Sequence, residues 1–144
     1  MTTATGRDRA HAAVRAYALR HRLDGAAFRS DGRVMLDFDG KCRVMVQPAA
    51  DNRIALTARL VNLDALSREG REQLLLRLAA LATGTLRDHA SCLGIDDQED
   101  ALVLQAQLPG TTDADQLEVQ LAQFVNVMAF WRHACAQEAG RIVQ

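Results

Sequence analysis

The chain has 144 residues, of which 49% are hydrophobic and 24% are charged; this composition is typical of a globular protein and excludes a wholly disordered chain. We expect a single domain over residues 1–144, with its core at about 7–136. Seventeen basic and 18 acidic residues give a net charge of −1, and six residues are aromatic. A nucleic-acid partner is not expected, because it would require a basic excess or stacking rings.

The charges are unevenly distributed along the chain. Residues 1–87 carry 15 basic and 9 acidic side chains (+6), whereas residues 88–144 carry 2 and 9 (−7). A solvated acidic surface accounts for this asymmetry; the alternative is a dipolar molecule whose two ends prefer different partners.

Neither a membrane segment nor a disulfide framework is indicated. No apolar run reaches the roughly 18 residues of a membrane-spanning helix, and residues 1–22 lack the apolar centre of a secretory signal. Cys42, Cys92 and Cys135 are odd in number and far apart, which favours small buried hydrophobes over disulfides or a metal knuckle. We therefore expect a cytoplasmic protein with no membrane partner.

Residues 7–23 predict the first helix, which ends at Asp24-Gly25. This helix carries two apolar stripes on roughly opposite sides, with arginines between them. One stripe suffices to dock the helix on a core, so the other predicts a further contact. The first stripe comprises Ala10, Ala13, Val14, Tyr17 and Ala18, and the second comprises Ala12, Ala16, Leu19 and Leu23.

The next part of the chain predicts three antiparallel strands. Apolar and polar residues alternate over 34–38, 42–46 and 54–60. Asp39-Gly40, between the first two runs, predicts a hairpin with a type I′ turn, because both residues tolerate a positive φ. The alternation also predicts that one face of this sheet is exposed to water.

Residues 67–86 predict a second helix that is apolar nearly all round. A helix of this kind is buried on more than one side. In a domain of this size a central helix is hard to surround, which predicts a subunit interface. Leu74, Leu78 and Leu81 share one face, Leu75, Ala79 and Ala82 form the next, and Leu76 and Ala80 lie further round.

Two further strands and a last helix complete the chain. The strands are predicted at residues 90–96 and 102–108, on either side of the acidic turn 96–100, and the helix starts near Thr112 and Asp115. The order α-β-β-β-α-β-β-α predicts an α+β fold. The main stripe of the last helix is Leu117, Leu121, Phe124, Met128 and Trp131, and a smaller one is Val119, Val127 and Phe130.

Residues with catalytic or metal-binding chemistry do not form a motif. Four histidines are scattered, and Asp88-His89 is the one adjacent carboxylate–histidine pair. Asp37 and Asp39 resemble a carboxylate pair, but Asp39 belongs to the hairpin turn. The acidic turn lacks the glycine and terminal glutamate of a calcium loop, and no phosphate-binding loop or nucleophile motif is present. We therefore predict no enzyme, no cofactor and no metal.

The ordered set of elements and motifs resembles the class I chaperones of bacterial type III secretion, the CesT/SycE-like family. The resemblance covers roughly residues 7–136. It rests on Asp31-Gly32 through Val46, Leu74-Leu75-Leu76-Arg77-Leu78, Leu93-Gly94-Ile95-Asp96, Leu102-Val103-Leu104 up to Leu108-Pro109, and Phe124 with Ala129-Phe130-Trp131-Arg132. Two features differ from the family pattern: the net charge is near zero, and Leu63-Asp64-Ala65 stands where a proline often follows the third strand.

The resemblance implies a cytoplasmic homodimer with a curved antiparallel sheet flanked by three helices. It implies binding of the N-terminal segment of a secreted effector, which is kept partly unfolded and secretion-competent, with the secretion ATPase as a further candidate partner. An extended segment would bind by strand addition and through apolar patches. The residues expected at the effector contact are Tyr17, Leu19, Leu23, Phe28, Leu36 and Val44, and those expected at the dimer interface are Leu74, Leu75, Leu78 and Leu81.

Two other functional classes remain open from the sequence. One is a regulatory or adaptor protein of the same fold that binds a folded partner protein. The other is an enzyme, which would need a convergent polar pocket that the sequence does not show.

Overall fold

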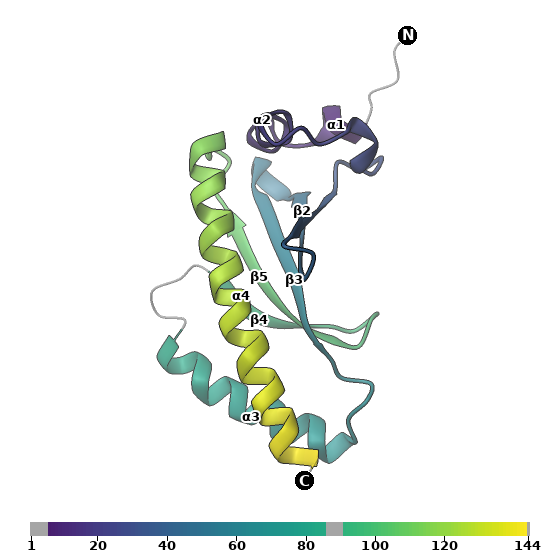
Figure 1. Ribbon diagram of the computed structural model, residues 1–144, viewed down its shortest axis with the longest axis vertical. Coiled ribbons are helices and arrows are strands. Elements are labelled where there is room, and N and C mark those ends of the chain that lie inside the picture. The colour runs from purple at the N-terminus through teal and green to yellow at the C-terminus, as the bar shows by residue number, and fades with distance from the viewer. Residues whose placement is uncertain (1–5, 86–90, 144) are drawn as a thin grey trace.

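The computed structural model describes residues 6–85 and 91–143. The α+β class and the predicted order of elements are confirmed, except that the first helix is divided in two. In Figure 1, α1 and α2 lie at one end of an elongated molecule and α3 at the other, while α4 runs between them across the sheet. The elements are α1 (Gly6–Arg9), α2 (Ala12–Arg20), η1 (Gly25–Ala27), β1 (Val34–Phe38), β2 (Cys42–Pro48), η2 (Ala50–Asn52), β3 (Ile54–Asn62), α3 (Arg68–Thr85), β4 (Ser91–Asp96), β5 (Ala101–Leu108) and α4 (Ala114–Val143).

The strands form one antiparallel five-stranded sheet in the order β1-β2-β3-β5-β4. β3 and β5 are therefore central, and β1 and β4 are the edges. The register of β3 against β5 shifts between Arg59 and Val61. Such an irregularity bends a strand and increases its twist, which agrees with the predicted curved sheet.

The hairpin between β1 and β2 has the predicted turn chemistry. Asp39 has φ 57° and Gly40 has φ 69°, so both occupy the left-handed region that a type I′ turn requires. Phe38 pairs with Cys42, which leaves Asp39 to Lys41 as the connection. The link is thus one residue longer than the Asp-Gly pair alone.

The first helix is not continuous over 7–23 as predicted. It breaks after Arg9, where the backbone of Gly32, at φ 92°, lies so close that a Cβ there would be 3.0 Å from the nitrogen of Ala10. His11 then caps α2, because its Nδ1 accepts a hydrogen bond from the Ala13 nitrogen at 3.0 Å. Arg15 donates to the carbonyl oxygen of Ala10 at 2.9 Å, which satisfies an acceptor freed by the break.

The longer helices begin at capping residues. Ser67 Oγ accepts a hydrogen bond from the Gly70 nitrogen at 3.0 Å before α3. Before α4, Asp113 and Gln116 form a reciprocal box: the Gln116 nitrogen donates to Asp113 Oδ1 at 2.8 Å, and the Asp113 nitrogen donates to Gln116 Oε1 at 3.0 Å. The predicted bounds of the second helix and fourth strand differ slightly, and residues 86 to 90 lie outside the described part of the chain.

The core lies between one face of the sheet and the helices. Inward side chains of the sheet meet the predicted stripe of α2 and that of α4, and both stripes are buried as expected. Because α4 packs against α2, α3 and β3, it joins the two ends of the molecule. The five residues of the main α4 stripe, Leu117, Leu121, Phe124, Met128 and Trp131, are each at most 1% exposed.

Candidate functional site

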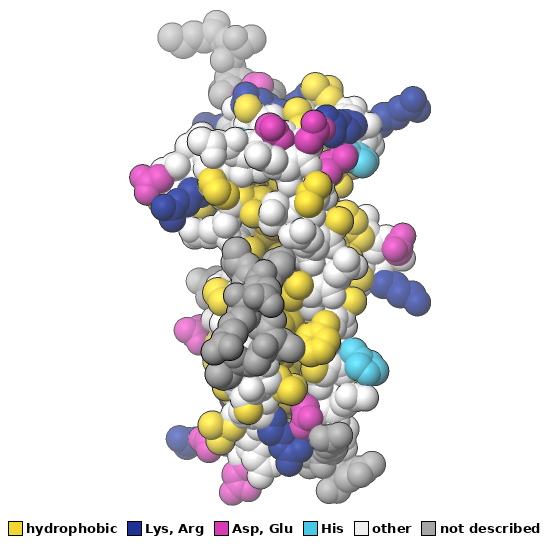
Figure 2. All heavy atoms as spheres, turned by 90° about the vertical axis from the view of Figure 1, so that its left-hand side faces the viewer, with side chains coloured by type: hydrophobic (Ala, Val, Ile, Leu, Met, Phe, Trp, Pro, Cys, Tyr) yellow, Lys and Arg dark blue, Asp and Glu magenta, His cyan; other side chains and the backbone are white. Residues whose placement is uncertain are grey.

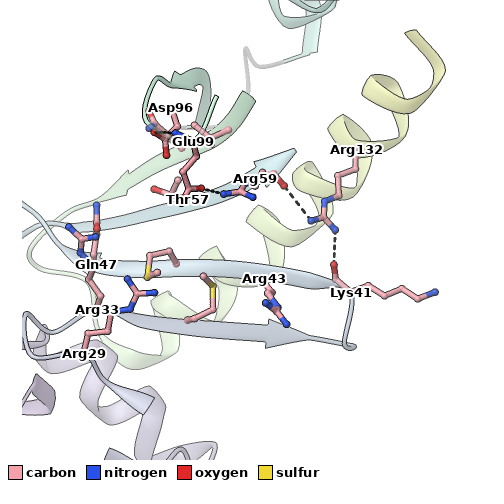
Figure 3. Close-up of a pocket in the computed structure, with 14 residues that line it drawn as sticks. Arg29, Arg33, Lys41, Arg43, Gln47, Thr57, Arg59, Asp96, Glu99 and Arg132 are labelled. Carbon is pink, nitrogen blue, oxygen red and sulfur yellow. Dashed lines mark hydrogen bonds and ion pairs between the residues drawn. The ribbon is translucent and has the colours of Figure 1, made fainter. Parts of the chain in front are cut away.

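The face of the sheet that turns away from this core carries an open hollow of ≈ 610 Å³. Strand alternation creates it, because inward Leu36 and Val44 leave their neighbours Met35, Arg43 and Met45 on the other side. Figure 3 shows side chains from several strands pointing into the same space. The central strands contribute Thr57, Arg59, Val103 and Gln105.

A second hollow, of ≈ 400 Å³, extends this surface toward the β4 edge. It shares Gln47, Thr57 and Gln105 with the first hollow and adds Cys92 from β4. The two hollows therefore form one uncovered surface across the sheet, which we call the open face. Its length and its exposed edge strand suit an extended chain better than a compact small molecule.

The open face is rich in arginine. The lining of the larger hollow contains six cations and two carboxylates, Asp96 and Glu99. Arg59 forms an ion pair with Glu99, and Arg33 forms one with Asp31, in which Arg33 Nε lies 3.0 Å from Asp31 Oδ2. Arg43 is 4.0 Å from Asp37, at the limit of an ion pair. The cations are Arg29, Arg33, Lys41, Arg43, Arg59 and Arg132.

Two of these six cations are differently placed. The Lys41 side chain extends past the end of the hairpin, away from the sheet (Figure 3). Arg132 comes from α4, and its guanidinium donates to the carbonyl oxygens of Lys41 at 2.6 Å and of Arg59 at 3.3 Å. Arg132 therefore holds the helix to the sheet, and the other four arginines, three of which pair with carboxylates of the same chain, are the candidate anion ligands of the open face.

The residues predicted to contact an effector fall into two groups. Tyr17, Phe28, Leu36 and Val44 are at most 8% exposed and belong to the core, so that in this fold they have almost no surface to offer a partner. Leu19 is 63% exposed on the second stripe of α2, and Leu23, beyond the end of α2, is partly buried against the core. The effector contact stays a prediction for this set, and within it Leu19 and Leu23 are the residues that one chain leaves at least partly exposed.

The residues predicted at the dimer interface divide in the same way. Leu74 and Leu78 are at most 1% exposed and pack in the core of the single chain, so their place at a dimer interface stays a prediction. Leu75 is partly buried, and Leu81 is 39% exposed. Leu76, which was not among the predicted interface residues, is 72% exposed.

Other large hydrophobic side chains are exposed on neighbouring elements. Ile95 of β4 and Phe130 of α4 are 48% and 45% exposed. Figure 2 shows the side of the molecule formed by α3 and α4, where hydrophobic side chains gather in the middle and most charged ones lie toward the two ends. The second stripe predicted for the last helix is thus not used up by the core of one chain.

Charged groups of α2 and α4 meet at the other end of the molecule. Arg20 Nη1 lies 2.9 Å from Asp115 Oδ1 and 3.3 Å from Glu118 Oε2. His21 Nε2 also forms a hydrogen bond with Glu118 Oε1. The hydrogen bond from His21, together with Arg20, holds the pKa of Glu118 below its ordinary value. Burial and the nearby Glu118 charge raise the pKa of Tyr17. These contacts fasten α2 to α4 and leave the outer stripe of α2 free.

The candidate metal ligands of the sequence can be located in the part of the chain that the structure describes. Among the described residues, no group of three or more histidine, cysteine, aspartate or glutamate side chains could hold a metal ion, and no helix is long and apolar enough to cross a membrane. Asp96 Oδ1 accepts hydrogen bonds from the nitrogens of Gln98 and Glu99, which explains the acidic turn as a structural element. The Asp88-His89 pair lies outside the described residues.

A model of the Tir chaperone protein (CesT) family matches residues 14–132. The chain belongs to this family. The resemblance expected from the sequence is therefore confirmed, with a match that runs from α2 to the second half of α4. No curated protein sequence matches the chain.

Solved structures share the CesT-family fold of this chain. A chain in the crystal structure of the ExsC–ExsE complex superimposes with a TM-score of 0.64 and 22% identity over 82% of this chain and 86% of that chain. A chain of the HopA1–SchA chaperone–effector complex superimposes with a TM-score of 0.62 and 17% identity, over 82% of this chain and 88% of that chain. A chain in the crystal structure of the Yersinia pestis type III secretion chaperone SycH, solved with a stable fragment of YscM2, superimposes with a TM-score of 0.61 and 17% identity. The match covers 84% of this chain and 98% of that chain.

The four arginines of the open face are the residues that sequence reasoning missed. For two of them a signal was present: Arg43 alternates with Val44, and Arg59 alternates with Ala58 and Leu60. A water-exposed sheet face was expected, but its arginines were not predicted to line a partner site.

Proposed function

We propose that the chain is a type III secretion chaperone that acts as a homodimer in the bacterial cytoplasm. It binds the N-terminal segment of a secreted effector, keeps it partly unfolded, and delivers it to the export apparatus and its ATPase. The observation that carries this proposal is a CesT-family fold with one face of its sheet uncovered. Similar folds solved as chaperone–effector and chaperone–fragment complexes support it.

The uncovered surfaces suit a chain without a tertiary structure of its own. An extended segment exposes alternate side chains and its backbone groups, and it needs a long surface to offset the entropy lost on ordering. The open face, the Leu19 stripe of α2 and the edge strand β4 together offer such a surface. The role proposed for them is binding, with no chemical step.

The homodimer is supported by apolar surface that one chain leaves exposed. Leu76 and Leu81 of α3 would lie at the interface, with Ile95 and Phe130 at neighbouring positions on β4 and α4. The 2.9 Å ion pair between Arg77 and Glu138 joins α3 to α4, so the two helices present a fixed surface. A stable dimer needs roughly 1,000 Å² of total buried area, more than one exposed leucine supplies.

Light scattering on matched variants tests the dimer. Leu76→Glu places a charge on the most exposed leucine of α3, and Val119→Glu places one on α4 at 55% exposure, outside the proposed interface. We expect wild type and Val119→Glu to be dimers at micromolar concentration and Leu76→Glu to be a folded monomer. A monomeric wild type at that concentration overturns the homodimer.

Capture from a secreting bacterium, followed by limited proteolysis, tests the chaperone function. The tagged chain is expected to retain a protein through its N-terminal part, and protease should leave only a short extended footprint of that protein protected. Leu19→Ala should weaken the capture. Protection of a whole folded domain would instead establish the regulatory or adaptor function, and the effector-binding proposal would be overturned.

A further inference from the structure

The β4–β5 hairpin places one of its own carboxylates on the open face. Asp96 holds the turn through its hydrogen bonds to the nitrogens of Gln98 and Glu99 at 3.0 and 3.3 Å. Asp100 pairs with Arg71 of α3, which fastens the other side of the turn. Glu99 then reaches over the sheet to form its ion pair with Arg59, as Figure 3 shows.

Arg59 is thus occupied by an intramolecular carboxylate that is not part of the sheet itself. Glu99 is 58% exposed and Arg59 48%, so water reaches the pair and its net stabilisation is small. A carboxylate from another chain could replace Glu99 at little cost. The pair shows which ligand chemistry this position of the open face accepts.

The rest of the face favours the same chemistry. Arg29 has no ion-pair partner among the described residues, and Arg33 and Arg43 hold carboxylates that lie outside the hollow, Asp31 and Asp37. Met35 and Met45 lie among these arginines and provide an apolar floor. A partner that satisfies both the floor and the arginines carries apolar and acidic side chains together.

We propose that the open face binds an effector segment that mixes acidic with apolar side chains, and that Glu99 is the internal carboxylate which this segment displaces from Arg59. The inference rests on the proposed function and adds the chemistry of the bound segment. A nucleic acid would also meet the arginines, but the methionine floor and the carboxylates of Asp96 and Glu99 disfavour a polyphosphate.

Fluorescence anisotropy with synthetic peptides of about 20 residues tests the inference. In the first peptide, apolar residues alternate with glutamate and serine; two matched peptides carry glutamine or lysine in place of glutamate. A labelled single-stranded DNA of similar length is the fourth probe. We expect the full-length chain to bind the glutamate peptide most tightly, with an affinity that falls as salt rises.

Three variants locate the effect. Glu99→Gln removes the ion pair of Arg59 and should raise the affinity for the glutamate peptide by about two- to fivefold, which corresponds to one partly exposed ion pair. The affinity for the glutamine peptide should not change. Arg29→Gln combined with Arg59→Gln should lower the affinity for the glutamate peptide by about fivefold or more. Arg68→Gln, which removes a charge that is 94% exposed on α3, is the matched control and should change nothing.

The inference is overturned if the lysine peptide or the DNA binds as tightly as the glutamate peptide, if the glutamate peptide does not bind, or if Glu99→Gln leaves its affinity unchanged. Glu99 is exposed, so its variant keeps the test valid even if the double arginine variant fails to fold. A chain that captures its effector but ignores peptide charge loses this inference alone. A chain that captures no effector loses the proposed function.

Discussion

The guanidinium of Arg132 donates a hydrogen bond of 2.6 Å to the carbonyl oxygen of Lys41, 91 residues away in the sequence. Lys41 lies in the turn between β1 and β2, and Arg132 lies in the second half of α4. A second bond, of 3.3 Å, runs from Arg132 to the carbonyl oxygen of Arg59 on β3. One side chain therefore fixes the helix against two parts of the sheet at the rim of the open face.

Replacing Arg132 should loosen this attachment. We expect Arg132→Gln to lower the free energy of unfolding by about 1–2 kcal/mol, because two charge-assisted hydrogen bonds to carbonyl oxygens are lost. Urea unfolding followed by the fluorescence of Trp131, the single tryptophan, measures this. Arg68→Gln, at a side chain that is 94% exposed, should stay within about 0.5 kcal/mol of wild type. Equal effects of the two substitutions would mean that the Arg132 bonds do not stabilise the fold.

The same chemical change at two leucines should separate the core from the partner surface. Leu36 is 6% exposed, so Leu36→Ala is expected to cost about 2–5 kcal/mol of stability. Leu19→Ala should cost less than about 0.5 kcal/mol, because that side chain is mostly in water already, and should weaken effector capture. Urea unfolding and the capture assay, run on both variants, give the comparison; a stable Leu36→Ala that fails to capture would restore Leu36 as a contact.

Local patterns were sufficient to predict most of the fold. The Asp39-Gly40 turn, the alternation of the strands and the main stripe of α4 each depend on residues close together in sequence, and each is confirmed. The break at His11 depends on contacts between distant segments: the backbone of Gly32 lies against Ala10, and His11 Nε2 donates to the carbonyl oxygen of Gly110 at 2.8 Å. No helical pattern in residues 7–23 contains that information.

The site was harder to predict, because alternation separates two faces of a strand without saying which face a helix covers. From the sequence, the apolar side with Leu36 and Val44 is the side expected to contact a hydrophobic partner. In the structure, helices of the same chain pack on that side, and its residues form the core. The surface that we propose for the partner lies on the other side, where Arg43 and Arg59 alternate with the buried residues. The ion pair between Arg59 and Glu99 joins β3 to the turn between β4 and β5. A contact between segments so far apart in the sequence cannot be predicted from local alternation.

Gly32 should be much less tolerant of a side chain than Gly25. Gly32 has φ 92°, and a Cβ there would lie 3.0 Å from backbone atoms of Arg9 and Ala10, whereas a Cβ at Gly25 meets nothing within 4 Å. We expect Gly32→Ala to cost about 1–3 kcal/mol and Gly25→Ala to be neutral or slightly stabilising. Urea unfolding of both variants tests this; a neutral Gly32→Ala would contradict the close approach of α1 to this turn.

The buried thiol of Cys135 should make stability fall at alkaline pH. Burial raises its pKa to about 11 from an ordinary value of 9.0, so the unfolded chain loses the proton at lower pH than the folded chain does. The contribution of Cys135 is therefore fully present below pH 9 and declines as the pH rises from about 9 to about 11. Urea unfolding at fixed protein concentration, repeated across this range, measures the decline.

Matched cysteine variants isolate that contribution from other groups that titrate at the same pH. Cys135→Ala should lose stability less steeply between pH 9 and 11 than wild type, because the buried thiol is gone. Cys92→Ala removes an exposed thiol and should keep the slope of wild type. If Cys135→Ala and wild type decline in parallel, the thiol ionises equally easily in the folded and unfolded chains, and its burial in the core does not disfavour the thiolate.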